Sequence, residues 1–189
     1  MLSGNFQKTQ LENGLRIVTE QVPYVRSISL GVWIEVGSRD EQKEEQGISH
    51  FLEHMLFKGT VHRNGFEIVH SLESLGGGLD GFTSRDLTCY YARCLDEHAP
   101  VAIEVLGDML QYSRLDPDEI EKEKRVVLEE IQSVEDTPDD WIHDLFAKSV
   151  WGTHPIAEPI QGTPQYVVEF TRERLCRYLE MHYVPERIV

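Results

Sequence analysis

The stretch SISLGVWIEVGS, residues 27–38, constrains the fold of this chain more than any other segment. Strict alternation of apolar and polar residues is typical of a β-strand that buries one face and exposes the other. Before it, residues 11–22 combine an Asn13-Gly14 turn with a second β-rich run. The two segments predict an antiparallel sheet, whose apolar face needs a covering layer. The alternating positions are Ile28, Leu30, Val32, Ile34 and Val36.

Helical patterns supply that layer. Apolar residues follow helical spacing over residues 48–57 and over a shorter segment at residues 66–76, whereas residues 79–95 return to a strand pattern. Most of the chain from residue 99 onward has helical periodicity. Strands first, then helices with strands between them, predict an α+β fold in which a mostly antiparallel sheet packs against helices.

Composition narrows the class of protein. The 189 residues suffice for one sizeable domain or two small ones, and 40% of them are hydrophobic. A formal net charge of −15 argues against nucleic acid or an anionic membrane as partner, and fits cationic substrates or solubility alone. The sequence has no membrane span and no signal or transit peptide pattern, which favours the bacterial cytoplasm over a mature organellar protein. Cys89, Cys94 and Cys176 form no CxxC pair, which favours a reducing compartment.

The segment HFLEHMLFKGT, residues 50–60, carries the candidate chemistry. At about 100° per residue, His50, Glu53 and His54 share the face of the helix that is opposite to its apolar stripe. Two imidazoles one turn apart can bind one tetrahedral zinc ion, and Glu53 can take a proton from the water that the metal activates. This HxxEH order is the reverse of the HExxH motif of zinc proteases. The alternative is a solvated helix face with two incidental histidines.

A third ligand is expected on a helix whose start is marked by Asp116 as N-cap and Pro117 at the first position. Glu123 and Glu130 lie two turns apart at the edge of its buried face. Glu119 points in much the same direction, so spacing does not single out Glu130. These carboxylates also fit an exposed acidic surface neutralised by nearby lysines. The predicted buried positions are Ile120, Val127, Leu128, Ile131 and Val134.

Four segments in this order resemble the N-terminal domain of the pitrilysin/insulinase family of zinc peptidases, the inverzincins. They are HFLEHMLFKGT, LESLGGGLDGFTSRDLTCYYARC, EKEKRVVLEEIQSVEDTPDD and HPIAEPIQGTPQYV. Within the family, they most resemble the mitochondrial processing peptidase β-subunit and its bacterial relatives. The resemblance implies that His50, His54 and Glu130 bind one zinc ion, that Glu53 is the general base, and that Glu123 steadies the site. The same ligand set also suits Mn²⁺ or Co²⁺.

The resemblance also places substrate binding on the strand after the glycine run, at Asp80, Gly81 and Phe82. Members of the family typically have Asn-Ala where this sequence has Asp80-Gly81. Gly81 would loosen an edge strand, and the charge of Asp80 would favour basic peptides. A turn pair without a role in specificity is the alternative.

Members of this family are built from two similar αβ domains or from pairs of them. The resemblance therefore implies that residues 1–189 are a single N-terminal catalytic domain of a longer two-domain peptidase, whose second domain or partner subunit is absent from this chain. The final VPERIV fits the start of a further strand. The expected function is a zinc metalloendopeptidase that hydrolyses extended peptides and is poorly active without its second domain. A non-catalytic interaction or recognition subunit of the same fold, and a metal hydrolase of non-peptide substrates, are the alternatives.

Overall fold

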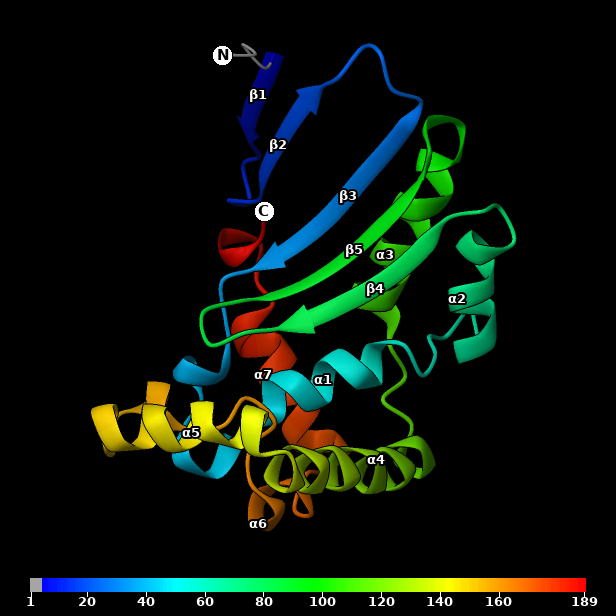
Figure 1. Cartoon of the computed structure of the whole chain (residues 1–189). Helices are drawn as coiled ribbons and strands as arrows, with labels where there is room; N and C mark the ends of the chain where they lie inside the picture. The colour runs from blue at the N-terminus through cyan, green and yellow to red at the C-terminus, as the bar shows by residue number, and fades with distance from the viewer. Residues whose placement is uncertain (1–4) are drawn as a thin grey trace.

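The computed structural model describes residues 5–189, and its strands form two antiparallel sheets (Figure 1). The larger sheet has the order β3-β5-β4, and the smaller one is the hairpin of β1 and β2. The antiparallel α+β architecture confirms the fold class that the sequence predicts. The strands are β1 (Asn5–Gln10), β2 (Arg16–Gln21), β3 (Ser27–Ile34), β4 (Gly78–Thr83) and β5 (Thr88–Leu95).

The segment at residues 79–95 differs in detail from the single strand that its pattern suggested. It forms the hairpin of β4 and β5, which reverses between Ser84 and Leu87. The Ser84 amide donates to the Leu87 carbonyl at 2.8 Å, and the Ser84 hydroxyl oxygen accepts from the Leu87 amide at 3.1 Å. Serine and aspartate favour such turns because their side chains bond to nearby backbone groups.

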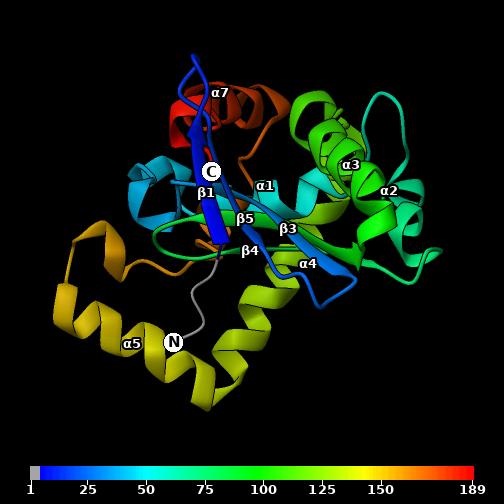
Figure 2. The ribbon, with the colours of Figure 1, turned by 90° about the horizontal axis from the view of Figure 1, so that it is seen from above.

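Three helices contact the three-stranded sheet and enclose the core with it (Figures 1 and 2). They are α1 (Ile48–Leu56), α2 (Gly65–Glu73) and α3 (Ala99–Tyr112). The apolar stripe of α1 points inward as its spacing predicts, and burying each such side chain contributes about 1.5–3 kcal/mol. The fully buried members of that stripe are Ile48, Phe51, Leu52, Met55 and Leu56.

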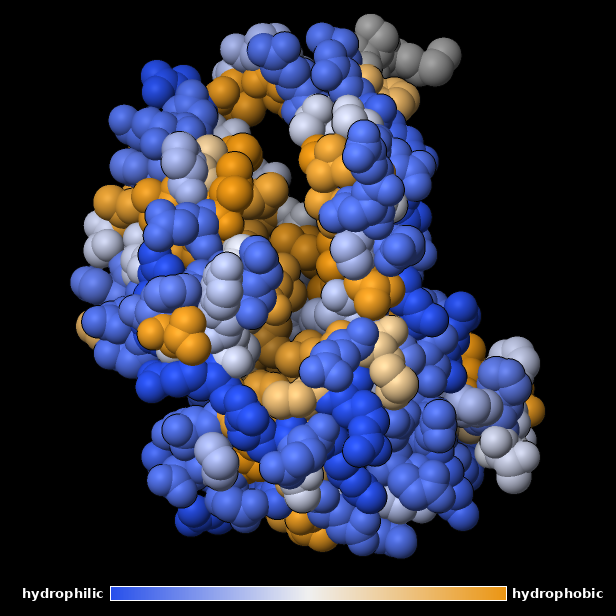
Figure 3. All heavy atoms as spheres, turned by 180° about the vertical axis from the view of Figure 1, so that it is seen from behind, coloured by the Kyte–Doolittle hydropathy of each residue, from blue (hydrophilic) through white to orange (hydrophobic). Residues whose placement is uncertain are grey.

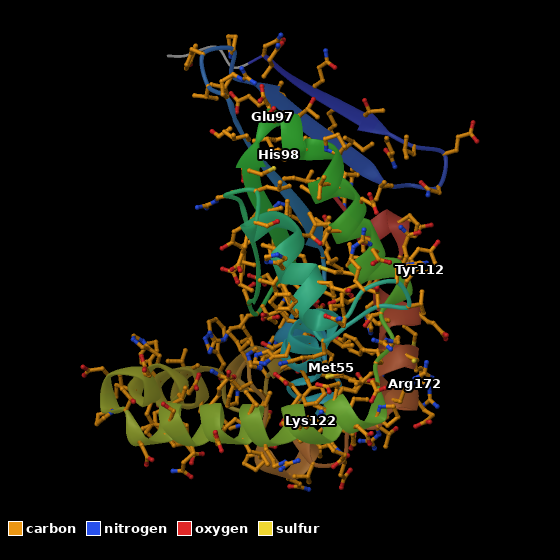
Figure 4. The ribbon with its side chains drawn as sticks, turned by 90° about the vertical axis from the view of Figure 1, so that its right-hand side faces the viewer. Met55, Glu97, His98, Tyr112, Lys122 and Arg172 are labelled. Carbon is orange, nitrogen blue, oxygen red and sulfur yellow. The ribbon has the colours of Figure 1, made fainter. Side chains whose placement is uncertain are left out.

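Helix α4 (Pro117–Asp136) lies against α1, as Figure 4 shows for Met55 of α1 and Lys122 of α4. Its start matches the prediction, since the Asp116 carboxylate accepts from two amides of the first turn. The helices that follow are α5 (Pro138–Trp151), α6 (Pro164–Val167) and α7 (Arg172–His182). Figure 2 shows α5 extending away from the rest of the domain.

Residues 187–189 connect the two sheets. Val189 exchanges two backbone hydrogen bonds with Trp33 of β3, at 2.8 and 2.9 Å. The Ile188 carbonyl accepts from the Arg16 amide of β2 at 3.2 Å. Only the end of VPERIV has the β-character that the sequence predicts, because Pro185–Arg187 form a short 3₁₀ helix. Figure 3 shows apolar side chains gathered in a hollow on the face of the molecule that Figure 1 hides.

Two of the three cysteines lie in the interior of the domain. Cys89 and Cys94 are buried, Cys176 is half-buried, and all three are free thiols. Within residues 5–189, no helix combines the length and the apolar character that crossing a bilayer requires.

A buried carboxylate on α3 stabilises the fold in a pH-dependent way. Asp108 is 5% exposed and accepts hydrogen bonds from Thr60 at 2.7 Å, from His62 at 2.6 Å and from Arg63 at 2.8 Å. Burial alone would raise the pKa of Asp108, but these hydrogen bonds outweigh it and lower the pKa below 3.8. Asp108 therefore stabilises the fold above the unfolded pKa, and this contribution is lost as the pH falls through the lower folded value.

We expect Asp108→Asn to lower the free energy of unfolding by about 2–4 kcal/mol at pH 7, because it leaves buried donors without a charged acceptor. Urea unfolding monitored by circular dichroism measures the change. Glu104→Gln is the matched control, since exposed Glu104 also binds Arg63 and its loss should change little. Equal effects of the two variants would contradict this account, as would a difference that does not shrink on acidification.

Candidate metal centre

Three potential ligand atoms converge between α1 and α4. The Nε2 atoms of His50 and His54 are 3.2 Å apart, and Glu130 Oε2 lies 3.7 and 3.6 Å from them. A tetrahedral zinc ion with bonds of about 2.0–2.1 Å separates its ligand atoms by about 3.4 Å. Two imidazoles and one carboxylate also form a set that zinc commonly uses. The residues present therefore fit a zinc ion in both spacing and chemistry.

The packing of α4 selects among the acidic residues that the sequence left open. Glu123 is 2% exposed and Glu130 is half-exposed, and both face α1, whereas Glu119 forms an ion pair with Lys122 on the helix surface at 2.6 Å. Among the described residues, the group able to hold a metal consists of His50, His54 and Glu130. The tertiary structure thus brings together the three residues to which the resemblance assigns metal binding.

Glu123 contacts the Nδ1 side of the His54 ring. Its carboxylate accepts from His54 Nδ1 at 2.8 Å and from Lys58 Nζ at 2.7 Å. Burial would raise the pKa of Glu123, but hydrogen bonds from His54 and Lys58 outweigh it and lower the pKa. An ionised Glu123 keeps a proton on His54 Nδ1, so that Nε2 is the ring nitrogen available to a metal ion.

The two imidazoles differ in their electrostatic environment. Burial, with a smaller effect of neighbouring His54, lowers the pKa of His50 to about 4, so His50 is neutral at pH 7. Burial would also lower the pKa of His54, but the hydrogen bond that its ring donates to Glu123 and the nearby carboxylates of Glu130 and Glu53 raise the pKa overall. Three carboxylates around one imidazole create a site that attracts a cation.

Glu53 lies beside the converging ligand atoms but does not belong to the group. Its Oε2 accepts a hydrogen bond from the hydroxyl of Thr83 on β4 at 3.2 Å. Burial raises the pKa of Glu53, although His54 and Thr83 oppose that rise. A carboxylate whose pKa is shifted toward neutrality is better suited to accept and return a proton.

The residues expected to bind substrate lie on β4, an edge strand of the three-stranded sheet. A Cβ atom at Gly81 would lie 3.2 Å from the Phe57 ring and 3.3 Å from Glu53 Cγ, so a larger residue here would require these neighbours to shift by a few tenths of an ångström. Asp80 accepts from the Tyr91 hydroxyl at 3.0 Å, and Phe82 is 39% exposed. The strand therefore runs directly past Glu53 with one edge unpaired within the described residues.

Sequence reasoning missed two contributors to this site. Lys58 follows His54 by one helical turn within the quoted motif, so the helical period could have indicated that both face Glu123. Thr83 carries no such signal, because only the fold of β4 against α1 brings it to Glu53.

An α+β domain that gathers two imidazoles, one carboxylate ligand and a separate carboxylate has the donors of a metallohydrolase centre. The chain belongs to the insulinase family of peptidases, peptidase family M16, whose model matches residues 16–164. It is 49% identical over 178 residues to YmxG, an uncharacterized zinc protease of Bacillus subtilis. That match covers 94% of this chain and 44% of the relative, so the chain spans less than half of the relative's length.

Solved structures share the fold. A protease from Helicobacter pylori superposes with a TM-score of 0.93 at 24% identity, over 98% of this chain and 45% of the other. An M16-like peptidase from Alicyclobacillus acidocaldarius gives 0.90 at 26% identity, over 100% of this chain and 45% of the other. An inactive M16 peptidase domain from Pseudomonas fluorescens also gives 0.90, at 18% identity over 98% of this chain and 45% of the other. Fold alone therefore does not establish catalysis, which depends on the residues at the site.

Proposed function

We propose that this chain is the metal-binding catalytic domain of a zinc metalloendopeptidase that hydrolyses peptide bonds in extended peptides. The observation that carries the proposal is the convergence of His50, His54 and Glu130, whose ligand atoms lie within 4.8 Å of one another. Glu53 stands beside them as a carboxylate that is not required for ligation. The high identity to a relative named as a zinc protease supports the choice of metal and of reaction.

Each residue has a separate task in this mechanism. His50, His54 and Glu130 hold one zinc ion per chain, and zinc, when bound, acidifies water and polarises a peptide carbonyl. Glu53 accepts a proton from the attacking water and returns it to the leaving amine. Thr83 donates a hydrogen bond to Glu53 and keeps its carboxylate next to the ligand atoms.

The substrate, in this proposal, is an extended peptide that adds to the free edge of β4 at Asp80, Gly81 and Phe82. Backbone pairing at a sheet edge accepts many sequences, and side-chain contacts then add selectivity. Asp80 places a negative charge near Glu53, which favours basic peptides. A second αβ domain or a partner subunit would close over the peptide. The location that we propose for the protein is the bacterial cytoplasm.

Metal content and peptide cleavage, measured on the purified chain, test the proposal together. One zinc ion per chain, with cleavage of a quenched basic peptide that stops on chelation and returns with zinc, is the expected result. Zinc without cleavage would favour a recognition module of the same fold, or a catalytic domain that needs its second half. Absence of zinc binding would overturn the proposal.

Glu123→Gln tests the support of His54. Glutamine keeps the shape of the side chain but lacks the charge that holds His54 and Lys58. We expect zinc affinity to fall by about 10–100-fold, the effect typical of groups that orient a metal ligand. Competition with a chromophoric chelator measures it. Glu121→Gln is the control, because exposed Glu121 lies on the same helix and its carboxylate pairs with Lys124. Unchanged affinity in Glu123→Gln would contradict the role.

A further inference from the structure

A buried carboxyl group outside the metal centre caps the helix that carries the histidines. Glu41, in the loop between β3 and α1, is 6% exposed. Its Oε2 accepts from the Gly47 amide at 2.8 Å, and its Oε1 accepts from the Ser49 amide at 2.9 Å. The first amides of a helix have no partner within the helix, and Gly47, the N-cap residue, has no side chain to supply one. Glu41 therefore provides the capping group for α1 from outside the helix.

Burying the Glu41 carboxyl group costs free energy, which indicates that the group has a role in the folded protein. Burial raises the pKa of Glu41 to about 8, and the hydrogen bonds from Ser49 and Gly47 oppose that rise. Both carboxyl oxygens are thus engaged by the first turn of α1. A carboxylate at this end of a helix is also favoured by the helix dipole.

The loop of Glu41 is attached on its other side to the β4–β5 hairpin. The amides of Ser38 and Arg39 donate to the carbonyls of Ser84 and Arg85, at 3.1 and 3.0 Å. Ser84 follows Thr83, the residue that binds Glu53. Glu41 consequently links the start of α1 to the hairpin that holds the catalytic carboxylate.

The two histidines differ in how their rings are held. His54 Nδ1 bonds to Glu123, whereas His50 Nδ1 is buried without a hydrogen-bond partner among the described protein atoms. Apart from its contact with the His54 ring, the His50 ring is therefore placed by the backbone of the first turn of α1. His50 directly follows Ser49, and the Ser49 amide donates a hydrogen bond to Glu41.

We infer that Glu41 is a positioning residue for His50: it holds the first turn of α1 so that His50 Nε2 meets His54 Nε2 and Glu130 Oε2. This inference rests on the proposed zinc site. It assigns the positioning of one of the two imidazoles to the β3–α1 loop. Glu123 orients one imidazole through its ring, and Glu41 places the other through its backbone. Loss of Glu41 should loosen the ligand set without removing a ligand.

The test compares Glu41→Gln with Glu44→Gln in the 189-residue chain. Both variants replace one carboxyl group of the same loop by an amide, but Glu44 is exposed and contacts none of the α1 amides that Glu41 binds. Zinc affinity is measured by chelator competition, the cobalt-substituted site by its visible absorption spectrum, and stability of the metal-free chain by thermal unfolding. We expect at least a tenfold loss of zinc affinity and an altered cobalt spectrum in Glu41→Gln alone.

A lower melting temperature with wild-type zinc affinity and cobalt spectrum would overturn the inference, since Glu41 would then serve stability only. If Glu41→Gln does not fold, Glu41→Asp replaces it, because a side chain shorter by one methylene keeps the carboxyl group but cannot reach both amides. Weaker zinc binding in Glu41→Asp supports the inference, and unchanged binding overturns it. Failure of the wild-type chain to bind zinc would overturn the proposed function and this inference with it, whereas equal binding by both variants would overturn the inference alone.

Discussion

Replacing Glu53 by Gln is expected to leave zinc bound while lowering the rate of peptide cleavage by about 10²–10⁴-fold, the contribution typical of a general base. Glutamine occupies the same volume and can still accept the hydrogen bond from Thr83, so the surroundings of the site stay intact. It cannot accept a proton from water at neutral pH. The loss should therefore fall on kcat more than on KM.

The measurement is kcat/KM for a quenched fluorescent peptide, with zinc content determined on the same samples. Glu73→Gln is the control, because Glu73 is an exposed residue at the end of α2. Two results would argue against the assigned role: cleavage at the wild-type rate, or loss of zinc together with activity. The second would mean that Glu53 contributes to ligation and not to proton transfer.

Glu130→Gln is expected to weaken zinc binding by more than about 100-fold, beyond the range seen when a group behind a ligand is removed. Glu130 supplies the single carboxylate of the converging set, 3.6–3.7 Å from both imidazole nitrogens. A neutral amide oxygen lacks the charge that offsets the loss of water from the ion. Peptide cleavage should fall in parallel and recover only in part when zinc is added in excess.

Two neighbours on the same helix make this experiment specific. Glu129→Gln changes an exposed residue adjacent in sequence, and Glu119→Gln changes the residue that spacing alone left as an alternative. Both should bind zinc as the wild type does. Wild-type affinity in Glu130→Gln, or an equal loss in Glu119→Gln, would show that a different carboxylate binds the metal.

The secondary structure could be predicted wherever a segment has a strong local period or a clear boundary signal. The alternation in β3 and the Asp116-Pro117 start of α4 identified both elements correctly. Strand β1 was not predicted, because each of its residues is exposed and its side chains have no apolar period. The pattern of residues 79–95 did not predict the reversal between β4 and β5, because Ser84 and Asp86 interrupt a run of strand-forming residues only briefly.

The sequence by itself determined which side chains share a helix face, because helical geometry relates residues one turn apart whatever surrounds them. His50, Glu53 and His54 could be grouped on that basis, and the family to which the chain belongs could be identified from the motifs. Helical spacing did not separate Glu130 from Glu119. That Glu130 meets the histidines, as the resemblance implied, was decided by the tertiary structure, because core packing between segments far apart in the chain places α1 against α4. The supports supplied by Thr83 and Glu41 lie on a neighbouring strand and in a loop, where no local period exists to indicate them.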